Sequence, residues 1–393
     1  MPSPGCRTAC SGGSALQPSE RRSESPGKRL LNQETSARRL RILCVCSASH
    51  WGGNEQWLSL ATAELAKRHE VYVCYGAAEL ASRFAPGIEA FQAPLRGLWD
   101  IVTIRRLGRF VRERGIELII ATRRTDYVVC GALSRILGIR NVVRLGITRR
   151  PWIPIWHRLV YGYLNDGIIV NAERTRKTLL HHLPIRPDKV RTIRNGVAVM
   201  RPLPEPPARE GAQFRITSVG SLIRRKGHRE LIQAVGLLPA EVRAAVQLEI
   251  LGAGREEARL RALIRRLGLE RQVWLRGHQL DPAPYLAACQ LFVLLSSNEG
   301  ISNALLEAMA LGIPVLTTPA GGHAEFLGDG DNGYLVESRR PQEVADKLKA
   351  ILHDDRREQV GARGCQTVRD QFRLDSMGAE LERFLLEVAA PPH

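Results

Sequence analysis

The stretch from Leu291 to Val315 constrains the fold more than any other part of this 393-residue chain. Its first five residues are all apolar and predict a buried parallel strand. A polar loop follows, and Asn303 is then expected to cap a helix whose apolar positions begin with Leu305 and Leu306. A strand, a loop and a helix N-terminus form a natural anion-binding site, because free backbone N–H groups and the helix dipole point at one place.

Two carboxylates bracket this predicted anion site. Glu299 lies in the loop and Glu307 lies in the helix, with seven residues between them. A carboxylate beside an anion site would repel a bare phosphate. The ligand is therefore expected to carry hydroxyl groups as well, as sugars do. The alternative is an ordinary βα unit with two surface acids.

The pair Glu299 and Glu307, followed by Ala-Met-Ala-x-Gly-x-Pro-Val, resembles the donor site of retaining GT-B glycosyltransferases of the group 1 or family four class. The resemblance implies an α/β fold with two doubly wound, Rossmann-like domains that face each other across a cleft. It implies that Glu299 faces the donor sugar and that Glu307 binds the ribose of the nucleotide. Backbone amides between them would hold sugar hydroxyls and diphosphate, namely those of Gly300, Ile301, Ser302, Asn303, Ala304 and Leu305. The turn at 321–325 and the segment 332–336 also fit the family.

A second loop supplies cations for the same ligand. Arg224, Arg225 and Lys226 precede a glycine at the start of a predicted helix. They suit a diphosphate, because lysine supplies a point charge and arginine a fork of donors. The resemblance assigns Lys226 to neutralising the leaving diphosphate, while Ser221 stands where the family has an arginine. Arg225, or less directly Arg224, would replace it; a solvated basic loop is the alternative, chiefly for Arg224.

The same resemblance assigns two further glycine turns to the donor. Gly52 and Gly53 follow the first predicted strand, Arg41 to Cys46, where glycine lets the backbone approach a phosphate closely. Gly277 and His278 follow another strand, and the resemblance implies that this loop holds the nucleotide base through backbone groups. Any tight turn between a strand and a helix would look similar.

The first half of the chain contains fewer recognisable site residues, and those present concern the acceptor. Many family members carry a histidine after the strand that corresponds to Asn141 to Leu145, but here Arg144 lies at that place. Asp126 follows another predicted strand and either faces the acceptor or caps the helix Tyr127 to Leu137, and we favour the cap. The Asn-Gly-Val triplet at 195–197 either matches the family's domain junction or forms a local turn.

Strands alternate with helices in two halves, which predicts parallel sheets with helices on both faces. The expected domains are residues 40–203, on the acceptor side, and residues 208–370, on the donor side, joined by a proline-rich linker at 201–207. By resemblance, the helix within 371–393 crosses back to the first domain. Residues 1–39 are rich in Ser, Arg, Gly and Pro and are expected to be a disordered tail.

The formal net charge is +17, and residues 1–40 contribute little of it, with seven Lys or Arg and three Glu. A basic folded part favours acidic partners such as nucleotide diphosphates or an anionic membrane face, although an arginine-rich proteome would have the same effect. No nucleic-acid-binding motif is visible. Cations mixed with Trp and Tyr at 149–161, together with the basic helix at 101–114, suit a membrane surface; a helix packed at the domain cleft or an acceptor-binding loop is the alternative.

The sequence also bears on the compartment. No apolar run approaches the ~20 residues of a membrane span, and residues 1–39 lack the apolar centre of a secretory signal. The eight cysteines show no zinc-finger spacing, and those in apolar runs are expected to pack as reduced thiols. We expect a cytoplasmic protein that is peripheral on the inner face of the membrane.

Together these features predict a retaining glycosyltransferase that moves a sugar from a nucleotide diphosphate sugar to a hydroxyl of a glycan or glycolipid of the cell-envelope polysaccharide or lipopolysaccharide type. Lys226, Arg225 and the helix N-terminus would neutralise the leaving diphosphate without a metal or other cofactor, and Glu299 would orient the sugar. Two alternatives remain: a nucleotide-sugar epimerase on the same fold, and a non-catalytic partner subunit that binds nucleotide sugar.

Overall fold

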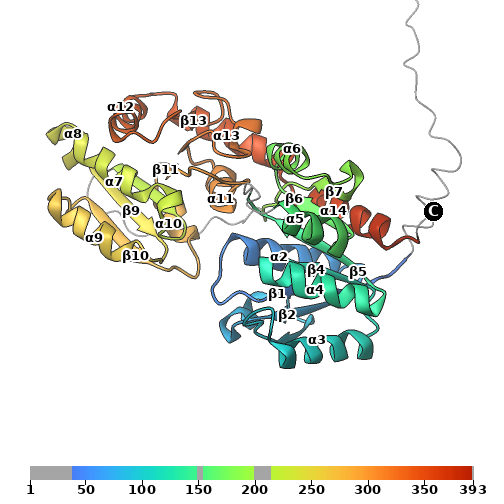
Figure 1. Cartoon of the computed structure of the whole chain (residues 1–393). Coiled ribbons are helices and arrows are strands. Elements are labelled where there is room, and N and C mark those ends of the chain that lie inside the picture. Colours follow the sequence, from blue (N-terminus) through green and yellow to red (C-terminus); the bar gives the residue numbers. More distant parts are fainter. Residues whose placement is uncertain (1–37, 148–153, 199–213, 392–393) are drawn as a thin grey trace, which may run out of the picture. The chain divides into compact units, whose positions relative to one another are not determined.

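The computed structural model describes residues 38–147, 154–198 and 214–391. The predicted proline-rich linker at 201–207, Trp152 and nearly all of the predicted tail lie outside these ranges. The described chain contains two parallel sheets, each flanked by helices (Figure 1).

The first sheet has seven parallel strands in the order β3-β2-β1-β4-β5-β6-β7. This is the order of a doubly wound fold, with its topological switch point between β1 and β4. The register places Val45 of β1 between Cys74 of β2 and Ala121 of β4. The strands are β1 (Arg41–Cys46), β2 (Glu70–Tyr75), β3 (Glu89–Gln92), β4 (Leu118–Ala121), β5 (Arg140–Leu145), β6 (Gly167–Val170) and β7 (Val190–Thr192).

Helices cover both faces of the first sheet. Alternate residues of a strand point to opposite faces, so Leu43 and Val45 pack in one hydrophobic cluster while Ile42 and Cys44 pack in the other. The helices of this part are α2 (Gly53–Leu65), η1 (Ala78–Arg83), α3 (Ile101–Glu113), α4 (Arg124–Leu137), α5 (Pro154–His157), η2 (Arg158–Leu164), α6 (Glu173–His182) and η3 (Pro187–Lys189).

The second sheet repeats the same strand order over six parallel strands, β10-β9-β8-β11-β12-β13, with its switch point between β8 and β11. Its strands are β8 (Phe214–Val219), β9 (Val246–Leu251), β10 (Val273–Gly277), β11 (Leu291–Leu294), β12 (Val315–Thr317) and β13 (Tyr334–Leu335). Its helices are η4 (Arg224–Lys226), α7 (His228–Leu237), α8 (Ala240–Ala244), α9 (Glu257–Arg266), α10 (Ala283–Ala288), α11 (Asn303–Ala310), η5 (His323–Glu325), α12 (Pro341–Leu352) and α13 (Arg357–Gln371).

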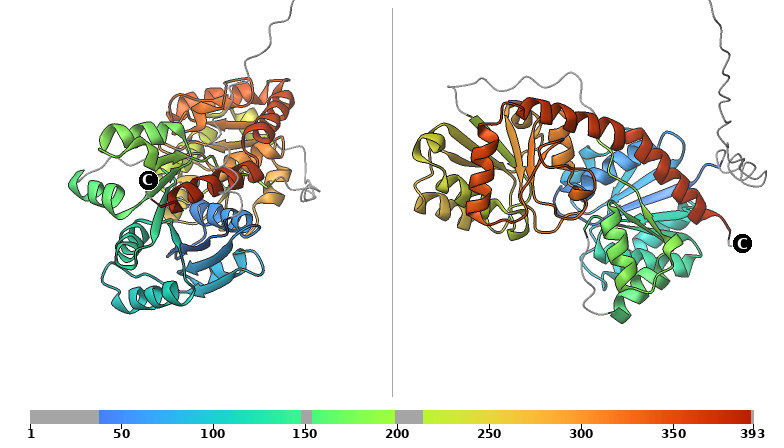
Figure 2. Two further views of the ribbon diagram at one scale, coloured as in Figure 1. Left: turned by 90° about the vertical axis from the view of Figure 1, so that its right-hand side faces the viewer. Right: turned by 90° about the horizontal axis from the view of Figure 1, so that it is seen from above.

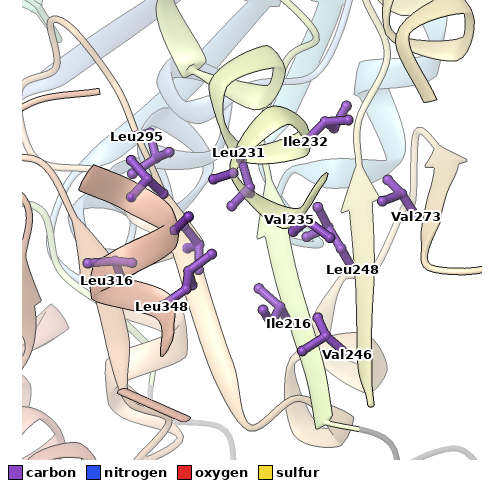
Figure 3. Packing of buried hydrophobic residues seen from close by; sticks show 14 of the residues in the cluster. Ile216, Leu231, Ile232, Val235, Val246, Leu248, Val273, Leu295, Leu316 and Leu348 are labelled. Atoms are coloured by element: carbon purple, nitrogen blue, oxygen red, sulfur yellow. The ribbon is translucent and has the colours of Figure 1, made fainter. Parts of the chain in front are cut away.

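A dense apolar core holds the second sheet against its helices. In one buried cluster, Ile216, Val246 and Leu248 of the strands pack with Leu231 and Val235 of α7, and Figure 3 shows Val235 beside Leu248. All five side chains are buried, and full burial of one such side chain stabilises the fold by roughly 1.5–3 kcal/mol. The rigid core fixes the ends of β8 and β11, from which the candidate site extends.

The last helix, α14 (Leu374–Ala389), packs beside α2 of the first domain (Figure 2). Its Met377, Leu381 and Phe384 lie in the same buried cluster as Trp57 and Leu58 of α2. Apolar burial on this face explains why the helix keeps one side apolar along its length.

The predicted α/β class, with two doubly wound Rossmann-like domains, is confirmed by the two sheets and their strand orders. Each domain has one switch point, and ligands of such folds bind outside the carboxyl ends of the strands at that point. The candidate places for a ligand are therefore the loops after β8 and β11 and those after β1 and β4.

Candidate active site

The second switch point brings two predicted motifs together. Arg225 and Lys226 follow β8, and Glu299 follows β11, which is the neighbouring strand. The backbone N–H of Ser297 donates to the carbonyl of Arg225 at 2.9 Å and ties the two loops to each other. Residues 73 or 74 positions apart in sequence thus lie in one cluster.

Glu299 is held between the two predicted cations. Its Oε1 accepts a hydrogen bond from Lys226 Nζ at 3.0 Å, and its Oε2 accepts one from Arg225 Nη1, which also donates to the carbonyl of Asn298. Glu299 is only 8% exposed, and this burial alone would raise the pKa of its carboxyl. The charges of Lys226 and Arg225 outweigh burial and hold that pKa below its ordinary value. The cluster therefore contains one ionised carboxylate and two cations, which leaves one positive charge in excess.

The turn after β12 packs directly on the Glu299 loop. Gly321 has a φ of +60°, and a Cβ at this residue would overlap the carbonyl oxygen of Glu299. The N–H of Gly322 donates to the carbonyl of Gly300 at 2.8 Å. Only glycine combines the left-handed backbone with so close an approach, so residue 321 helps to fix where Glu299 lies.

His323 is a neighbour of the cluster and was not among the predicted site residues. Its Nδ1 lies 3.1 Å from Thr317 Oγ1, and that hydroxyl donates to the carbonyl of Leu294. Nδ1 must therefore donate to Thr317, which leaves Nε2 as an acceptor, and Nε2 has no partner among the residues that the structure describes. Burial lowers the pKa of His323 to about 4, so the ring is neutral near pH 7. Its position after β12 at the same carboxyl edge is the signal that could have identified it.

Ser302 is the N-cap residue of α11 and Asn303 its first helical residue, so the prediction that Asn303 caps this helix is wrong. The side chain of Asn303 has other partners: its Nδ2 donates to the carbonyl of Gly53 and to Gln56 Oε1, and its Oδ1 accepts from Asn195. These contacts outweigh a cap bond. The first turn of α11 keeps N–H groups without an intrahelical acceptor, and these suit an anion.

The loop before α11 is clamped by two asparagines that follow strands of the first sheet. Asn195 Nδ2 and Asn171 Nδ2 donate to the carbonyl of Ile301 at 2.9 and 3.3 Å. A Cβ on Gly300 would overlap Asn171 Oδ1. The side chains of Ile301 and Leu305 are buried in the hydrophobic core, so these two residues can offer a ligand only their backbone groups. Asn195 belongs to the Asn-Gly-Val triplet visible in the sequence, whereas no sequence pattern singles out Asn171.

Glu307 reaches the first domain through Gln56. Gln56 Nε2 donates to Glu307 Oε1. Burial raises the pKa of Glu307 to about 7, the Gln56 hydrogen bond opposes this rise, and the charge of Asp281 adds to it. The Glu307 carboxyl therefore changes its charge within the pH range in which cellular enzymes work.

Arg144 is buried within a polar network. Its Nη2 donates to Asn195 Oδ1 at 3.0 Å, its Nη1 donates to Asn54 Oδ1, and its Cζ lies 4.5 Å from the centroid of the Trp57 ring. Its Nε has no partner in the described part of the chain. Burial lowers the pKa of Arg144 to about 10, which leaves it cationic at pH 7. The guanidinium ties β5 to Asn195, and its predicted place on the acceptor side stays a prediction.

Asp126 does not cap α4, contrary to the prediction, because that helix begins at Arg124 and its cap residue is Arg123. The Asp126 carboxylate instead accepts hydrogen bonds from the backbone N and the Oγ of Ser47, at 3.2 and 2.5 Å. It therefore anchors the loop after β1. Burial raises the pKa of Asp126 to about 6, although the bonds from Ser47 oppose this rise.

The remaining predicted donor residues lie in three loops. Gly52 is the N-cap residue of α2, and the carbonyl of Gly53 accepts from Asn303, so this loop does meet α11. Ser221 is exposed after β8, and Gly277 ends β10 with a φ of +71°. Within the described ranges, no hydrogen bond joins Ser221 or Gly277 to Glu299, Lys226 or Arg225.

The described residues show neither a metal-binding cluster nor a membrane-spanning helix. Over residues 38–147, 154–198 and 214–391, no group of three His, Cys, Asp or Glu side chains is arranged to hold a metal ion. None of the helices described is both long enough and apolar enough to cross a bilayer.

Each half of the chain matches the sequence model of a known protein family. Residues 51–201 match the sequence model of Glycosyltransferase Family 4, and residues 201–366 match that of Glycosyl transferases group 1. The chain is 36% identical over 163 residues to the lipopolysaccharide core biosynthesis glycosyltransferase LpsE of Rhizobium meliloti; the match covers 41% of this chain and 46% of LpsE, about half the length of that relative.

A second relative is matched over most of its length. The chain is 34% identical over 306 residues to the N-acetyl-alpha-D-glucosaminyl L-malate synthase of Bacillus anthracis, covering 74% of this chain and 80% of that protein. Among solved structures, HepE of Anabaena in complex with UDP and glucose has a TM-score of 0.75 at 20% identity, covering 89% of this chain and all of HepE. The likeness to HepE concerns the fold. With the two matching sequence models and the relative from Bacillus anthracis, the chain belongs to the group 1 glycosyltransferases, which have the GT-B fold.

Proposed function

We propose that this protein is a retaining glycosyltransferase that moves a sugar from a nucleotide diphosphate sugar to a hydroxyl group of an acceptor. The observation that carries the proposal is the cluster of Glu299, Lys226 and Arg225 beside the N-terminus of α11. It joins cations and helix amides, which bind phosphate, to a carboxylate, which can bind sugar hydroxyls. The complex of HepE with UDP and glucose supports a nucleotide-sugar donor.

The donor would extend along the carboxyl edge of the second sheet. Lys226, Arg225 and the first-turn amides of α11 would bind the diphosphate, Glu299 would face the sugar, and Glu307 would accept hydrogen bonds from the ribose. Negative charge grows on the leaving phosphate oxygen in the transition state, and preorganised cations stabilise that charge. Because this cluster already has a positive charge in excess, we propose that transfer does not depend on a metal ion.

Retention requires the acceptor hydroxyl to attack the anomeric carbon from the face that the diphosphate leaves. The bond from that carbon to the phosphate oxygen breaks, the bond to the acceptor oxygen forms, and the acceptor proton passes to the leaving phosphate oxygen. Both oxygens of Glu299 are bound by cations, which favours an orienting and electrostatic role for this carboxylate over attack as a nucleophile.

The acceptor would be a glycan or glycolipid of the cell envelope, as the name of the Rhizobium relative suggests. We further propose that the protein works in the cytoplasm, at the inner face of the membrane. Part of the predicted membrane segment is not described, but Trp156 and Leu159 within it are exposed.

A second exposed surface supports membrane contact. The bilayer surface consists of residues 98–109, which include the end of the loop after β3 and the first part of α3. Trp99 is 89% exposed and Val102 79% exposed, and no carboxylate pairs with Arg105, Arg106 or Arg109 within the described residues. Exposed apolar side chains next to unpaired cations suit an anionic bilayer.

Liposome flotation tests the bilayer surface. The double variant Trp99→Ser, Val102→Ser should lose most of the binding to vesicles that contain an anionic phospholipid, because its apolar contact with the bilayer is removed. Leu280→Ser is the matched control, since Leu280 is 70% exposed in the second domain, and it should float like the wild type. Equal flotation of the two variants, or no flotation of the wild type at low salt, would remove the membrane proposal.

A thermal-shift panel tests the function itself. UDP, GDP, ADP and their common sugar derivatives are added to the wild type, and at least one should raise the melting temperature, because a ligand at about 100 times its Kd stabilises the fold by about 2.7 kcal/mol. If no nucleotide or nucleotide sugar shifts the melting temperature at millimolar concentration, the donor assignment is wrong.

A further inference from the structure

Gln56 contacts the carboxyl group that the proposed function assigns to ribose binding. It lies in the first turn of α2, three residues after Gly53, in the first domain. Its Nε2 donates to Glu307 Oε1, and its Oε1 accepts from Asn303 Nδ2 at 3.1 Å. Both ends of the amide are therefore engaged with α11, and the direction of the side chain is determined.

The partners of Gln56 are themselves fixed. Asn303 Nδ2 also donates to the carbonyl of Gly53 at 3.2 Å, and its Oδ1 accepts from Asn195 at 2.7 Å. Asn195 in turn accepts from the buried guanidinium of Arg144. A continuous series of hydrogen bonds thus runs from Arg144 to Glu307, and networks of this kind, when satisfied, favour one arrangement of their members.

We propose that Gln56 is a positioning residue for donor binding, which holds one oxygen of Glu307 so that the other oxygen faces the ribose hydroxyls. This inference rests on the proposed function and extends it. The first domain then contributes to the donor pocket, and its role is not confined to the acceptor. Within the described residues, Gln56 is the hydrogen-bond donor to the Glu307 carboxyl, and Oε2 has no such donor.

The charge of Glu307 provides a signature of this role. Burial and Asp281, in the loop before α10, raise the pKa of Glu307, whereas Gln56 opposes the rise. Ribose hydroxyls donate more strongly to an ionised carboxylate than to a neutral carboxyl. Removing the Gln56 donor should raise the pKa further, so that less of the ionised form is present near pH 7 and nearly all of it is restored at high pH.

The test is a titration of the Gln56→Met variant with UDP, GDP and ADP, continued between pH 6 and pH 9 with whichever binds the wild type most tightly. Methionine has a similar length and favours helices, and the melting temperature of the variant checks its fold. We expect affinity to fall about three- to tenfold at pH 6.5, as for the loss of one hydrogen bond, and the ratio to wild type to shrink as pH rises. Protonation of the nucleotide phosphate changes with pH in the same way for both proteins, so it does not affect this ratio.

Two controls separate positioning from a general effect. Gln342 donates to Asp346 at 3.0 Å on the exposed face of α12, so Gln342→Met removes a similar bond far from the proposed pocket and should leave affinity unchanged. In a Glu307→Gln background, Gln56→Met should have no pH-dependent effect.

The possible failures can be told apart. Wild-type affinity in Gln56→Met, or a loss that is the same at every pH, overturns the positioning role while the donor site stands. If the wild type binds none of the three nucleotides, the proposed function and this inference fail together.

Discussion

The two switch points have the same strand order but differ in the partners of their buried carboxylates. At the first, between β1 and β4, the buried carboxyl groups of Asp126 and Glu55 receive hydrogen bonds from Ser47 and Cys46. At the second, between β8 and β11, Glu299 lies among cations beside free helix amides. Strand order decides where a site can form, and the charges of the loops decide which of two equivalent places suits an anion.

The largest expected effect is at the second switch point. Lys226→Ala should lower the turnover of donor by about 100- to 1000-fold, the range seen when one preorganised transition-state donor is removed. Arg224→Ala is the matched control, because Arg224 lies in the same turn but is exposed, and it should stay near wild type. Single-turnover kinetics with the donor found in the thermal-shift panel measures both. Wild-type turnover in Lys226→Ala would mean that Lys226 does not neutralise the leaving diphosphate, and the proposed difference between the two switch points would be wrong.

A smaller effect is expected from the turn that supports Glu299. Gly321→Ala should lower the free energy of unfolding by about 2–4 kcal/mol, since its Cβ would overlap the Glu299 carbonyl and its backbone would be strained. Gly330 has a φ of +72° but open space around it, so Gly330→Ala should cost only about 1 kcal/mol. Urea unfolding compares the two variants. Equal losses of unfolding free energy would mean that the close packing of Gly321 on the Glu299 loop contributes nothing to stability.

The smallest effect is a pH dependence at the first switch point. The pKa of Asp126 is about 6 in the folded state against 3.8 for an ordinary aspartate, so the folded state binds the extra proton between these values. Its contribution to stability is present below pH 4 and is lost as pH rises through 6. The stability of the wild type relative to Asp126→Asn should therefore fall by about 1–3 kcal/mol between pH 4 and pH 7. A difference that is constant, or that grows with pH, contradicts the burial of this carboxyl.

The second switch point was the easier one to predict, because its signals are local. Glu299 and Glu307 lie within one loop and one helix, and Arg225 and Lys226 are adjacent in sequence. The parallel sheets followed from the alternation of strand and helix patterns. Such features depend on neighbouring residues, and a sequence displays them directly.

The contacts that could not be predicted join distant residues. Gln56 and Glu307 are 251 positions apart, and Asn171 meets Ile301 across 130 positions. The predicted caps at Asn303 and Asp126 were wrong for a related reason: a cap bond contributes only about 1 kcal/mol, and each side chain has stronger partners that lie far away in the sequence.

Calorimetric titration of nucleoside diphosphates into the wild type, Glu307→Ala and Asp126→Asn tests whether the nucleotide binds at the second switch point. We expect one binding site in the wild type, affinity at least about tenfold weaker in Glu307→Ala, as for a lost charge-assisted hydrogen bond pair, and unchanged affinity in Asp126→Asn at the same pH. Unchanged affinity in Glu307→Ala, or a loss only in Asp126→Asn, would mean that the nucleotide binds elsewhere than the second switch point.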